Sequence, residues 1–175
     1  MTRAQFEHAI RAAGAVLNVT ELLVIGSQAI HGSVAGDLPE EASRSVEVDV
    51  AAMYDADGRL ADLIDGSIGE SSMFHETFGY YAQGVVETSA VLPSGWRDRL
   101  VRFETPATRG VVAWCLEVHD LWVSEAIAGR PKDLEFCHAL LERRLVDRER
   151  LRGRLDLVDA LDDRVRAAVR ARIGR

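Results

Sequence analysis

The chain is organised around Val24-Ile25-Gly26-Ser27 and the later stretch Ser45-Val46-Glu47-Val48-Asp49-Val50. The first stretch is an apolar run that ends in a Gly-Ser turn, as expected of a short interior strand followed by a helix. The second stretch alternates polar and apolar residues, which predicts a strand. Residues two apart on a strand point to the same face, so Glu47 and Asp49 are expected to project side by side.

Two adjacent carboxylates repel each other, so a fold gains nothing from pairing them unless a cation lies between them. Mg²⁺ in proteins uses one or two carboxylates together with substrate phosphates. The turn at Gly26 and Ser27 offers backbone N–H groups and a hydroxyl to an anion. The sequence therefore predicts a nucleotide-handling site, with Glu47 and Asp49 as metal ligands and Gly26 and Ser27 as nucleotide-binding residues.

The composition predicts one globular domain. The chain has 175 residues, of which 47% are hydrophobic, and a net charge of −7, which implies no general affinity for nucleic acids or membranes. The charge is uneven, because residues 139–175 hold eleven arginines against seven acids, whereas residues 1–138 carry 10 basic and 21 acidic residues. This basic tail could lie on the acidic surface of its own domain or contact RNA.

Cysteine usage and the lack of targeting signals predict a cytoplasmic protein. Cys115 and Cys137 lie in apolar contexts without metal-type spacing, so both are expected to be buried, reduced thiols. Glu7 and Arg11 interrupt the N-terminal region, which therefore does not fit a signal peptide. No apolar stretch approaches transmembrane length, and no membrane partner is expected.

Periodicity places the expected elements along the chain. The expected strands are residues 22–25, 45–53, 80–90, 99–104 and 111–118. The expected helices are one capped by Thr2 and ending near Asn18, then 28–35, 57–69, 121–128, 132–144, a short one after Asp147, and 157–173. Ser27, Asp57, Asp120 and Asp147 are the expected N-caps of the helices that follow them. Residues 71–79 fit either a short helix or a loop.

This order predicts an α/β (α+β) fold with a mixed β-sheet, flanking helices and a C-terminal helical bundle. We expect residues 1–118 to form the α/β core and residues 119–175 to form a helical region packed on it. His31, His119 and His138 are isolated in the sequence and are interpreted as structural. No Ser/His/Asp or Cys/His arrangement stands out, which leaves a metal-free hydrolase with little support.

Residues 24–50 resemble the signature of the nucleotidyltransferase superfamily related to DNA polymerase beta. Ile25-Gly26-Ser27 matches its first part, and Glu47-Val48-Asp49-Val50 matches its two acids separated by one apolar residue, with a longer spacer than usual. His119-Asp120-Leu121 and Gly129-Arg130-Pro131-Lys132-Asp133, which holds the sole lysine of the chain, look like the downstream motif of a bacterial branch. That branch contains abortive-infection and type IV toxin–antitoxin nucleotidyltransferases.

The resemblance covers most of residues 20–145 and implies roles for individual residues. Glu47 and Asp49 would hold Mg²⁺ (or Mn²⁺), and Gly26 and Ser27 would bind the terminal phosphates of an NTP. Lys132 would neutralise a phosphate as a point charge. Asp133 would orient Lys132 or contribute at the edge of the metal site. A third carboxylate that helps to activate the attacking hydroxyl would be Glu87, chosen by position.

The resemblance also implies a reaction, the transfer of a nucleoside monophosphate from an NTP to the 3′ end of tRNA or to a protein hydroxyl. A toxin of this kind would have a cognate antitoxin as its partner. Two departures favour an alternative: the first carboxylate is Glu47 where Asp is commoner, and Glu125 stands where relatives often carry Lys. That alternative is a catalytically inactive nucleotidyltransferase-like protein that acts as a binding or regulatory module.

Overall fold

The computed structural model describes residues 1–53, 55 and 57–174. The strands are β1 (Glu21–Val24), β2 (Glu47–Ala52), β3 (Tyr81–Gly84), β4 (Val101–Phe103) and β5 (Val112–Cys115). The longer helices are α1 (Arg3–Leu17), α4 (Arg59–Ile68), α6 (Val118–Ala128), α7 (Pro131–Glu142), α8 (Arg148–Asp156) and α9 (Asp163–Gly174). Short helices are α2 (Ile30–Ser33), α3 (Glu40–Ser43) and α5 (Met73–Phe78), with 3₁₀ turns at Ser27–Ala29, Glu87–Ser89, Trp96–Arg99 and Pro106–Thr108.

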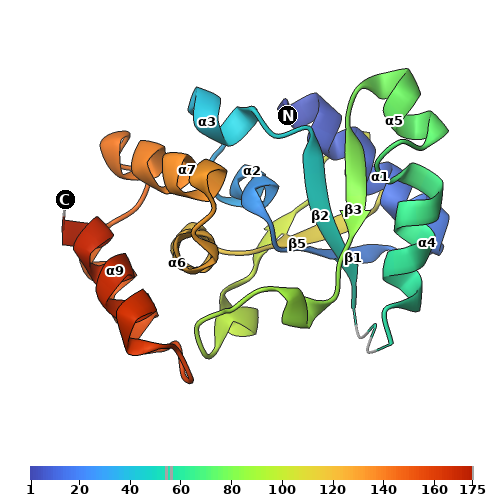
Figure 1. Ribbon diagram of the computed structural model, residues 1–175. Helices are drawn as coiled ribbons and strands as arrows, with labels where there is room; N and C mark the ends of the chain where they lie inside the picture. The colour runs from blue at the N-terminus through green and yellow to red at the C-terminus, as the bar shows by residue number, and fades with distance from the viewer. Residues whose placement is uncertain (54, 56, 175) are drawn as a thin grey trace.

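The five strands form one mixed sheet in the order β3-β2-β1-β5-β4. The central strand β1 pairs antiparallel with β2 and parallel with β5. β3 runs parallel to β2 at one edge, and β4 runs antiparallel to β5 at the other. The predicted mixed sheet with flanking helices is confirmed, and Figure 1 shows β2 and β3 side by side near the middle of the molecule.

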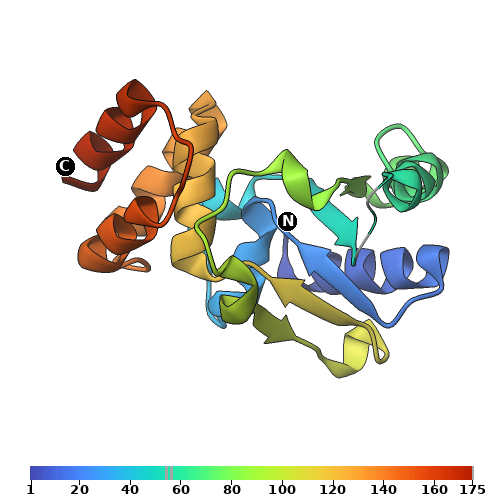
Figure 2. The same ribbon diagram turned by 90° about the horizontal axis from the view of Figure 1, so that it is seen from below.

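Helices α1 and α4 pack against the sheet and against each other. Thr2 and Gln5 form a capping box at the start of α1, and Asn18 ends that helix in a left-handed conformation. Phe6 of α1 is fully buried, stacks on His31 and contacts Phe103 edge to face. Figure 2 shows α1 and α4 on the opposite side of the molecule from α6 to α9.

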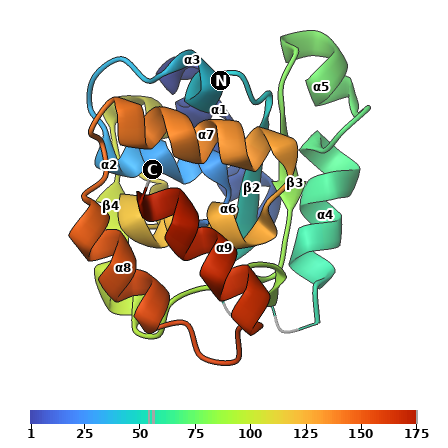
Figure 3. The ribbon, with the colours of Figure 1, turned by 60° about the vertical axis from the view of Figure 1, so that its left-hand side comes forward.

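Helices α6 to α9 gather beside α2, as Figures 1 and 3 show. α6 contacts α7, α8, α9, α2 and the 3₁₀ turn at Ser27–Ala29. Its residues 118–126 are all buried, so α6 joins the other C-terminal helices to the core. The division of the chain at residue 118 stays a prediction. In the part of the chain that the structure describes, every helix is too short or too polar to cross a membrane.

Several predicted boundaries and caps were wrong. The expected helix over 28–35 is a 3₁₀ turn followed by the four-residue α2, with Gly26 rather than Ser27 at the N-cap position and no side-chain cap. The strand expected over 80–90 ends at Gly84, because residues 87–89 form a 3₁₀ turn. The loop before β2 contains α3. For residues 71–79, where a short helix and a loop were both open, the short helix is confirmed as α5.

Three aspartates were expected to cap helices, and only Asp147 does, by accepting a hydrogen bond from the Arg150 amide at 2.8 Å. At α4 the N-cap is Gly58. The Asp57 carboxylate accepts the Arg59 amide at 3.4 Å from one position before the cap, and the Asp55 carboxylate accepts the next two helix amides. α6 begins earlier than predicted, with Glu117 as its cap. Asp120 therefore lies inside the helix, fully buried, where it pairs with Arg99 and Arg154.

The helix α4 and the strand β3 approach each other so closely at Gly84 that a side chain does not fit between them. A Cβ added at Gly84 would lie 2.0 Å from the Ala61 carbonyl oxygen, whereas one added at Gly66, within α4, would meet nothing within 4 Å. We expect Gly84→Ala to lower the free energy of unfolding by about 1–3 kcal/mol, because α4 must move off the strand. Gly66→Ala, the control, is expected to raise it by about 0.5–1 kcal/mol. Urea denaturation measures both, and equal effects would contradict the close packing.

Candidate active site

The two carboxylates predicted to face one way do so. Glu47 and Asp49 lie on β2 opposite Tyr81 and Gln83 of β3, and both acids are half-buried. Val48, between the two acids, is fully buried on the other face of the strand. The strand thus holds both acids on one face by burying that valine among apolar neighbours.

The Gly-Ser turn lies directly against the second acid. A Cβ added at Gly26 would lie 1.6 Å from Asp49 Oδ2 and 2.5 Å from Asp49 Cγ. Glycine is required here for this approach and not for its backbone angles, because φ at Gly26 is −83°. The Ser27 and Gln28 amides come in the first turn of the 3₁₀ segment, where no helical carbonyl precedes them, and so can donate to a ligand.

The pKa of Asp49 is raised to about 6. Burial is the main cause, the neighbouring Glu47 carboxylate adds to it, and Lys132 and Arg130 oppose it. A carboxyl group in this position gains little from being ionised until another positive charge arrives. The raised pKa therefore marks this acid pair as a place where a cation is favoured.

The donor set can be tested against the metal that the resemblance implies. Among the described residues, no group of three or more His, Cys, Asp or Glu side chains is placed to hold a metal ion. Mg²⁺ does not need such a group, because it is commonly bound by one or two carboxylates, water and substrate phosphates. Glu47 and Asp49 fit Mg²⁺ or Mn²⁺ in that way and do not form a complete protein cage.

Glu47 is oriented by two hydrogen bonds. The Tyr81 hydroxyl donates to Glu47 Oε2 at 2.8 Å, and the Lys132 ammonium donates to Oε1 at 3.2 Å. Lys132 is on the first turn of α7, and α7 thus reaches the β2 acids through this ion pair. Lys132, predicted to neutralise a phosphate, is therefore present at the site, and in the structure it pairs with Glu47.

Asp133 contacts Arg130 and not Lys132. Its buried carboxylate accepts the Arg130 Nε hydrogen at 2.7 Å and the Arg130 amide at 3.0 Å. Glu125 of α6 lies close by, with Oε2 3.9 Å from Arg130 Nη2. Burial raises the pKa of Glu125 to about 8, with Asp133 as the next cause.

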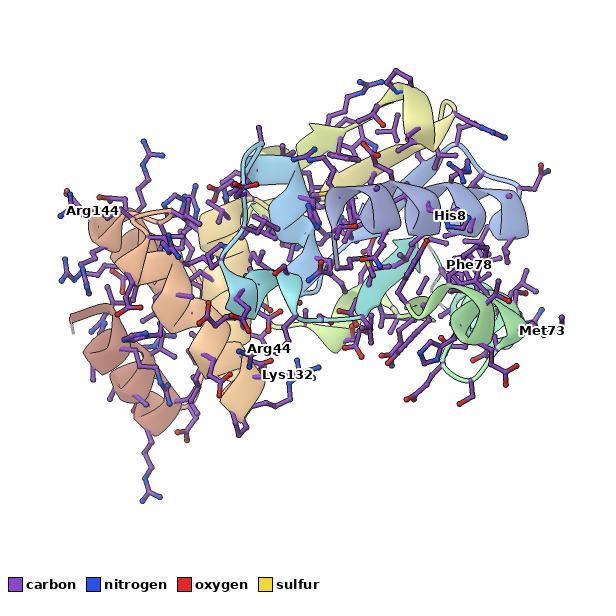
Figure 4. The ribbon with its side chains drawn as sticks, turned by 90° about the horizontal axis from the view of Figure 1, so that it is seen from above. His8, Arg44, Met73, Phe78, Lys132 and Arg144 are labelled. Atoms are coloured by element: carbon purple, nitrogen blue, oxygen red, sulfur yellow. The ribbon has the colours of Figure 1, made fainter. Side chains whose placement is uncertain are left out.

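Two cavities lie on either side of this cluster, and both are lined by Glu47, Asp49, Glu125 and Arg130. The first, of about 330 Å³, has mixed walls, with apolar groups from residues such as Ile25, Val85, Val91 and Ile127 and polar groups from Gln83, Ser89 and Ser124 in addition to the charged cluster. The second, of about 290 Å³, is lined by Ser27, Arg44, Lys132 and Asp133, among others. Figure 4 shows Lys132, on α7, and Arg44, which follows α3, close to each other near the centre of the view from above.

The structure brings together every predicted site residue except Glu87. Glu87 lies beyond the end of β3 and forms an ion pair with Arg97. It lines neither cavity. The residue of β3 beside Asp49 is Gln83, which has no charge.

Three further residues of the site had little or no signal in the sequence. Tyr81 lies in a stretch predicted to be a strand. Only the pairing of β3 with β2 shows that its hydroxyl donates a hydrogen bond to Glu47. Arg130 stands within the quoted Gly-Arg-Pro-Lys-Asp motif, but nothing in that spacing shows that Asp133 binds it. Glu125 was noted as a departure from relatives, and its burial beside Asp133 appears only when α6 packs on α7.

The remaining sequence candidates lie away from these cavities. Cys115 and Cys137 are buried free thiols, as predicted. His119 accepts the Asp147 amide and pairs with Glu117, which is a structural role. Arg144 lies just beyond the C-terminal end of α7, whereas Lys132 is in the first turn of that helix, and Figure 4 shows the two far apart.

A mixed sheet with an acid pair facing a Gly-Ser turn, and with cations from a following helix, defines the nucleotidyltransferase class of site. The family described as "Nucleotidyltransferase of unknown function (DUF6036)" matches residues 5–170, nearly the whole chain. The protein belongs to this family, and membership of a nucleotidyltransferase family implies a nucleotide substrate. Comparisons with curated proteins and with solved structures found no match.

Proposed function

We propose that this protein transfers a nucleoside monophosphate from an NTP to an acceptor hydroxyl and releases pyrophosphate, with Mg²⁺ or Mn²⁺ bound by Glu47 and Asp49. The observation that carries the proposal is the contact between the Gly26 turn and Asp49, where a Cβ would lie 1.6 Å from the carboxylate oxygen. A phosphate held by the turn would thus lie beside the acid pair. A half-buried acid pair next to an anion-binding turn suits a metal–triphosphate complex, which brings a cation to the acids and phosphates to the turn.

Phosphoryl transfer depends mainly on positioning and on neutralising charge. When bound, the metal ion would neutralise part of the triphosphate charge. The Ser27 hydroxyl and the amides after Gly26 would hold terminal phosphates, and Lys132, which lines the same cavity, would add a positive charge. Tyr81 keeps the Glu47 carboxylate oriented through its hydrogen bond.

The attacking hydroxyl would enter beside the acid pair. Asp49, ionised in the loaded site, is the carboxylate in position to accept its proton or orient it, since a general base must lie within hydrogen-bond reach. Glu87 is bound to Arg97 and is not included in this proposal. The acceptor is a hydroxyl of RNA, such as the 3′ end of tRNA, or of a protein, and a toxin role with a cognate antitoxin belongs to the same proposal.

Transfer of label tests the reaction. The protein is incubated with each of the four NTPs, labelled at the α-phosphate, with Mg²⁺ or Mn²⁺, and with total tRNA or with total protein as acceptor. We expect label in one of the two acceptor pools, dependent on metal and absent with Asp49→Asn. Label in neither pool with any NTP, from folded protein, would contradict catalysis.

A separate prediction concerns tRNA as the acceptor and the arginines of residues 139–175. Arg143 and Arg144 are exposed, whereas Arg148 donates to the Ile173 carbonyl and so also stabilises α8 against α9. If tRNA is the acceptor, replacing Arg143 and Arg144 with alanine is expected to weaken tRNA binding. The slope of log affinity against log salt concentration is expected to become shallower by about one to two. Filter binding at several salt concentrations measures this, and an unchanged salt slope would assign the basic tail a structural role.

One observation favours the second candidate, a binding or regulatory module without catalysis. Both Glu47 oxygens already have partners, Tyr81 and Lys132. Beside the acid pair, the only other carboxylate that lines both cavities among the described residues is Glu125, which is buried against Asp133. This candidate predicts nucleotide binding without transfer, or no nucleotide binding, and the labelling experiment separates it from the enzyme.

A further inference from the structure

We propose that Arg130 is a fixed phosphate-binding side chain of this site, and that the buried carboxyl groups of Asp133 and Glu125 are the positioning residues that hold its guanidinium there. The inference rests on the proposed function, because it assigns a part of the nucleotide, a phosphate group, to this side chain. It adds a residue to which the motif analysis gave no role, and it gives Asp133 a role other than orienting Lys132.

The first step is the anchoring of Arg130. One Asp133 oxygen accepts both the Arg130 Nε hydrogen at 2.7 Å and the Arg130 backbone amide at 3.0 Å. The Asp133 side chain is only 2% exposed, so this acceptor is itself fixed. Glu125, 8% exposed, lies 3.9 Å from Arg130 Nη2 and limits the guanidinium on a second side. A charged group held in this way loses little freedom when an anion binds.

The second step is the position of Arg130 relative to the two cavities. Arg44, Arg130 and Lys132 are the basic residues that line these cavities in the described chain, and Arg130 alone lines both. Glu47 and Asp49 also line both cavities, so a ligand that extends from one cavity to the other would pass both Arg130 and the acid pair. A nucleoside triphosphate, with a nucleoside at one end and phosphates at the other, is such a ligand.

The third step is that Arg130 still has donors to offer. A guanidinium carries five N–H donors, and Asp133 occupies the one on Nε. The Arg130 side chain is 59% exposed, so its terminal nitrogens are accessible from the cavities. Two parallel N–H donors match a phosphate, which a lysine ammonium binds only as a point charge.

The other two cations form different ion pairs. Lys132 donates to Glu47 at 3.2 Å, and a metal ion at Glu47 would compete with it for the same carboxylate. Arg44 pairs at 3.0 Å with Glu135, another residue that lines the second cavity. Arg130 is hydrogen-bonded to Asp133, which is not part of the acid pair, so metal binding would leave its anchoring intact.

Inorganic tripolyphosphate, which carries no base, is the probe for this phosphate site. Calorimetry with Mg²⁺ present is expected to show that Arg130→Ala weakens tripolyphosphate binding by about 10- to 100-fold, the scale of one or two charge-assisted hydrogen bonds. Arg130→Lys is expected to recover only part of this loss, because it lacks the fork of donors. Binding of Mn²⁺ alone, followed by electron paramagnetic resonance, is expected not to weaken in either variant.

Arg170→Ala is the matched control. Arg170 is 56% exposed and also forms an ion pair with an aspartate, Asp156, but it lies on α9 and lines neither cavity. Its tripolyphosphate affinity is expected to equal that of the wild type. An equal loss in Arg170→Ala and Arg130→Ala would show a general effect of charge and would overturn the inference.

A double-mutant cycle tests the positioning role of Asp133. Asp133→Asn is expected to weaken tripolyphosphate binding, and the double variant Asp133→Asn/Arg130→Ala is expected to bind no more weakly than Arg130→Ala alone, because Asp133 acts through Arg130. Additive losses would mean that Asp133 acts independently of Arg130 and would overturn its positioning role. Thermal melting identifies any variant that has lost its fold.

Failure of the proposed function and failure of this inference alone give different results. Folded wild type that binds neither tripolyphosphate nor any NTP would overturn the proposed function and this inference with it. Wild type that binds tripolyphosphate, with Arg130→Ala binding equally well, would overturn the inference alone and leave the proposed function in place.

Discussion

Asp49→Asn is expected to make the metal-free protein more stable and, at the same time, unable to bind Mg²⁺ with nucleotide. The Asp49 pKa of about 6 in the folded protein lies above the value near 3.9 of an unfolded chain. The folded state therefore binds this proton more tightly than the unfolded state. This contribution to stability is fully present below about pH 4 and is lost as the pH rises through about 6.

At pH 8 the ionised carboxylate thus opposes folding, and removing its charge is expected to raise the free energy of unfolding by on the order of 2 kcal/mol. The gain is expected to disappear near pH 4, where the wild-type carboxyl is protonated. Urea denaturation at pH 4, 6 and 8 measures it. Adding Mg²⁺ and NTP is expected to stabilise the wild type and to leave Asp49→Asn unchanged.

Asp37→Asn is the control for this comparison, because Asp37 is an exposed loop residue with no ion pair among the described residues. It is expected to change the free energy of unfolding little at any pH. If Asp49→Asn were less stable than the wild type at pH 8, the ionised carboxylate would be a stabilising partner of Lys132 or Arg130. The acid pair would then be a structural ion cluster, and the metal site would lose its support.

Gly26→Ala is expected to abolish transfer with little loss of fold. The backbone at Gly26 is not in the left-handed region, so alanine causes no backbone strain there. The added methyl group would, however, lie 1.6 Å from Asp49 Oδ2, and either Asp49 or the turn must move. A displacement of about 1 Å at a reacting site can reduce the rate about 100-fold, and we expect at least that loss of label transfer.

Gly36→Ala provides the matched control for Gly26→Ala. Gly36 lies in the same connection between β1 and β2, and a Cβ there meets nothing within 4 Å. Its transfer activity and NTP affinity are expected to equal those of the wild type. Full activity of Gly26→Ala would mean that the turn does not hold its ligand against Asp49, and the geometry of the proposed site would be wrong.

The parts of the site that lie on one strand or one turn could be predicted from the sequence. Alternation alone fixes Glu47 and Asp49 on one face, since a strand gives no other arrangement once Val48 and Val50 are buried. The Gly-Ser turn follows an apolar strand, and its closeness to the acids follows from the antiparallel pairing of β1 with β2. The sole lysine was a distinctive signal because it stood in a motif.

The parts that depend on packing between distant elements could not be predicted. Asp133 lies one residue from Lys132 in sequence, but the helical turn directs it back to Arg130 at the N-cap. Glu87 was chosen because residues 80–90 fit a strand, whereas that strand ends at Gly84 and the chain turns away. Asp120 is inside α6 because Glu117 caps that helix three residues earlier, and its carboxylate is taken by Arg99 and Arg154 from distant parts of the chain.

The central claim, that Glu47 and Asp49 hold a metal ion that binds nucleotide with the protein, is tested most directly by calorimetric titration. Each of the four NTPs is titrated into wild type and into Asp49→Asn, with and without Mg²⁺. We predict binding of at least one NTP to the wild type that requires Mg²⁺ and that disappears in Asp49→Asn. Metal-independent binding, or equal binding by the variant, would contradict the claim, as would the absence of binding to any NTP by folded wild type.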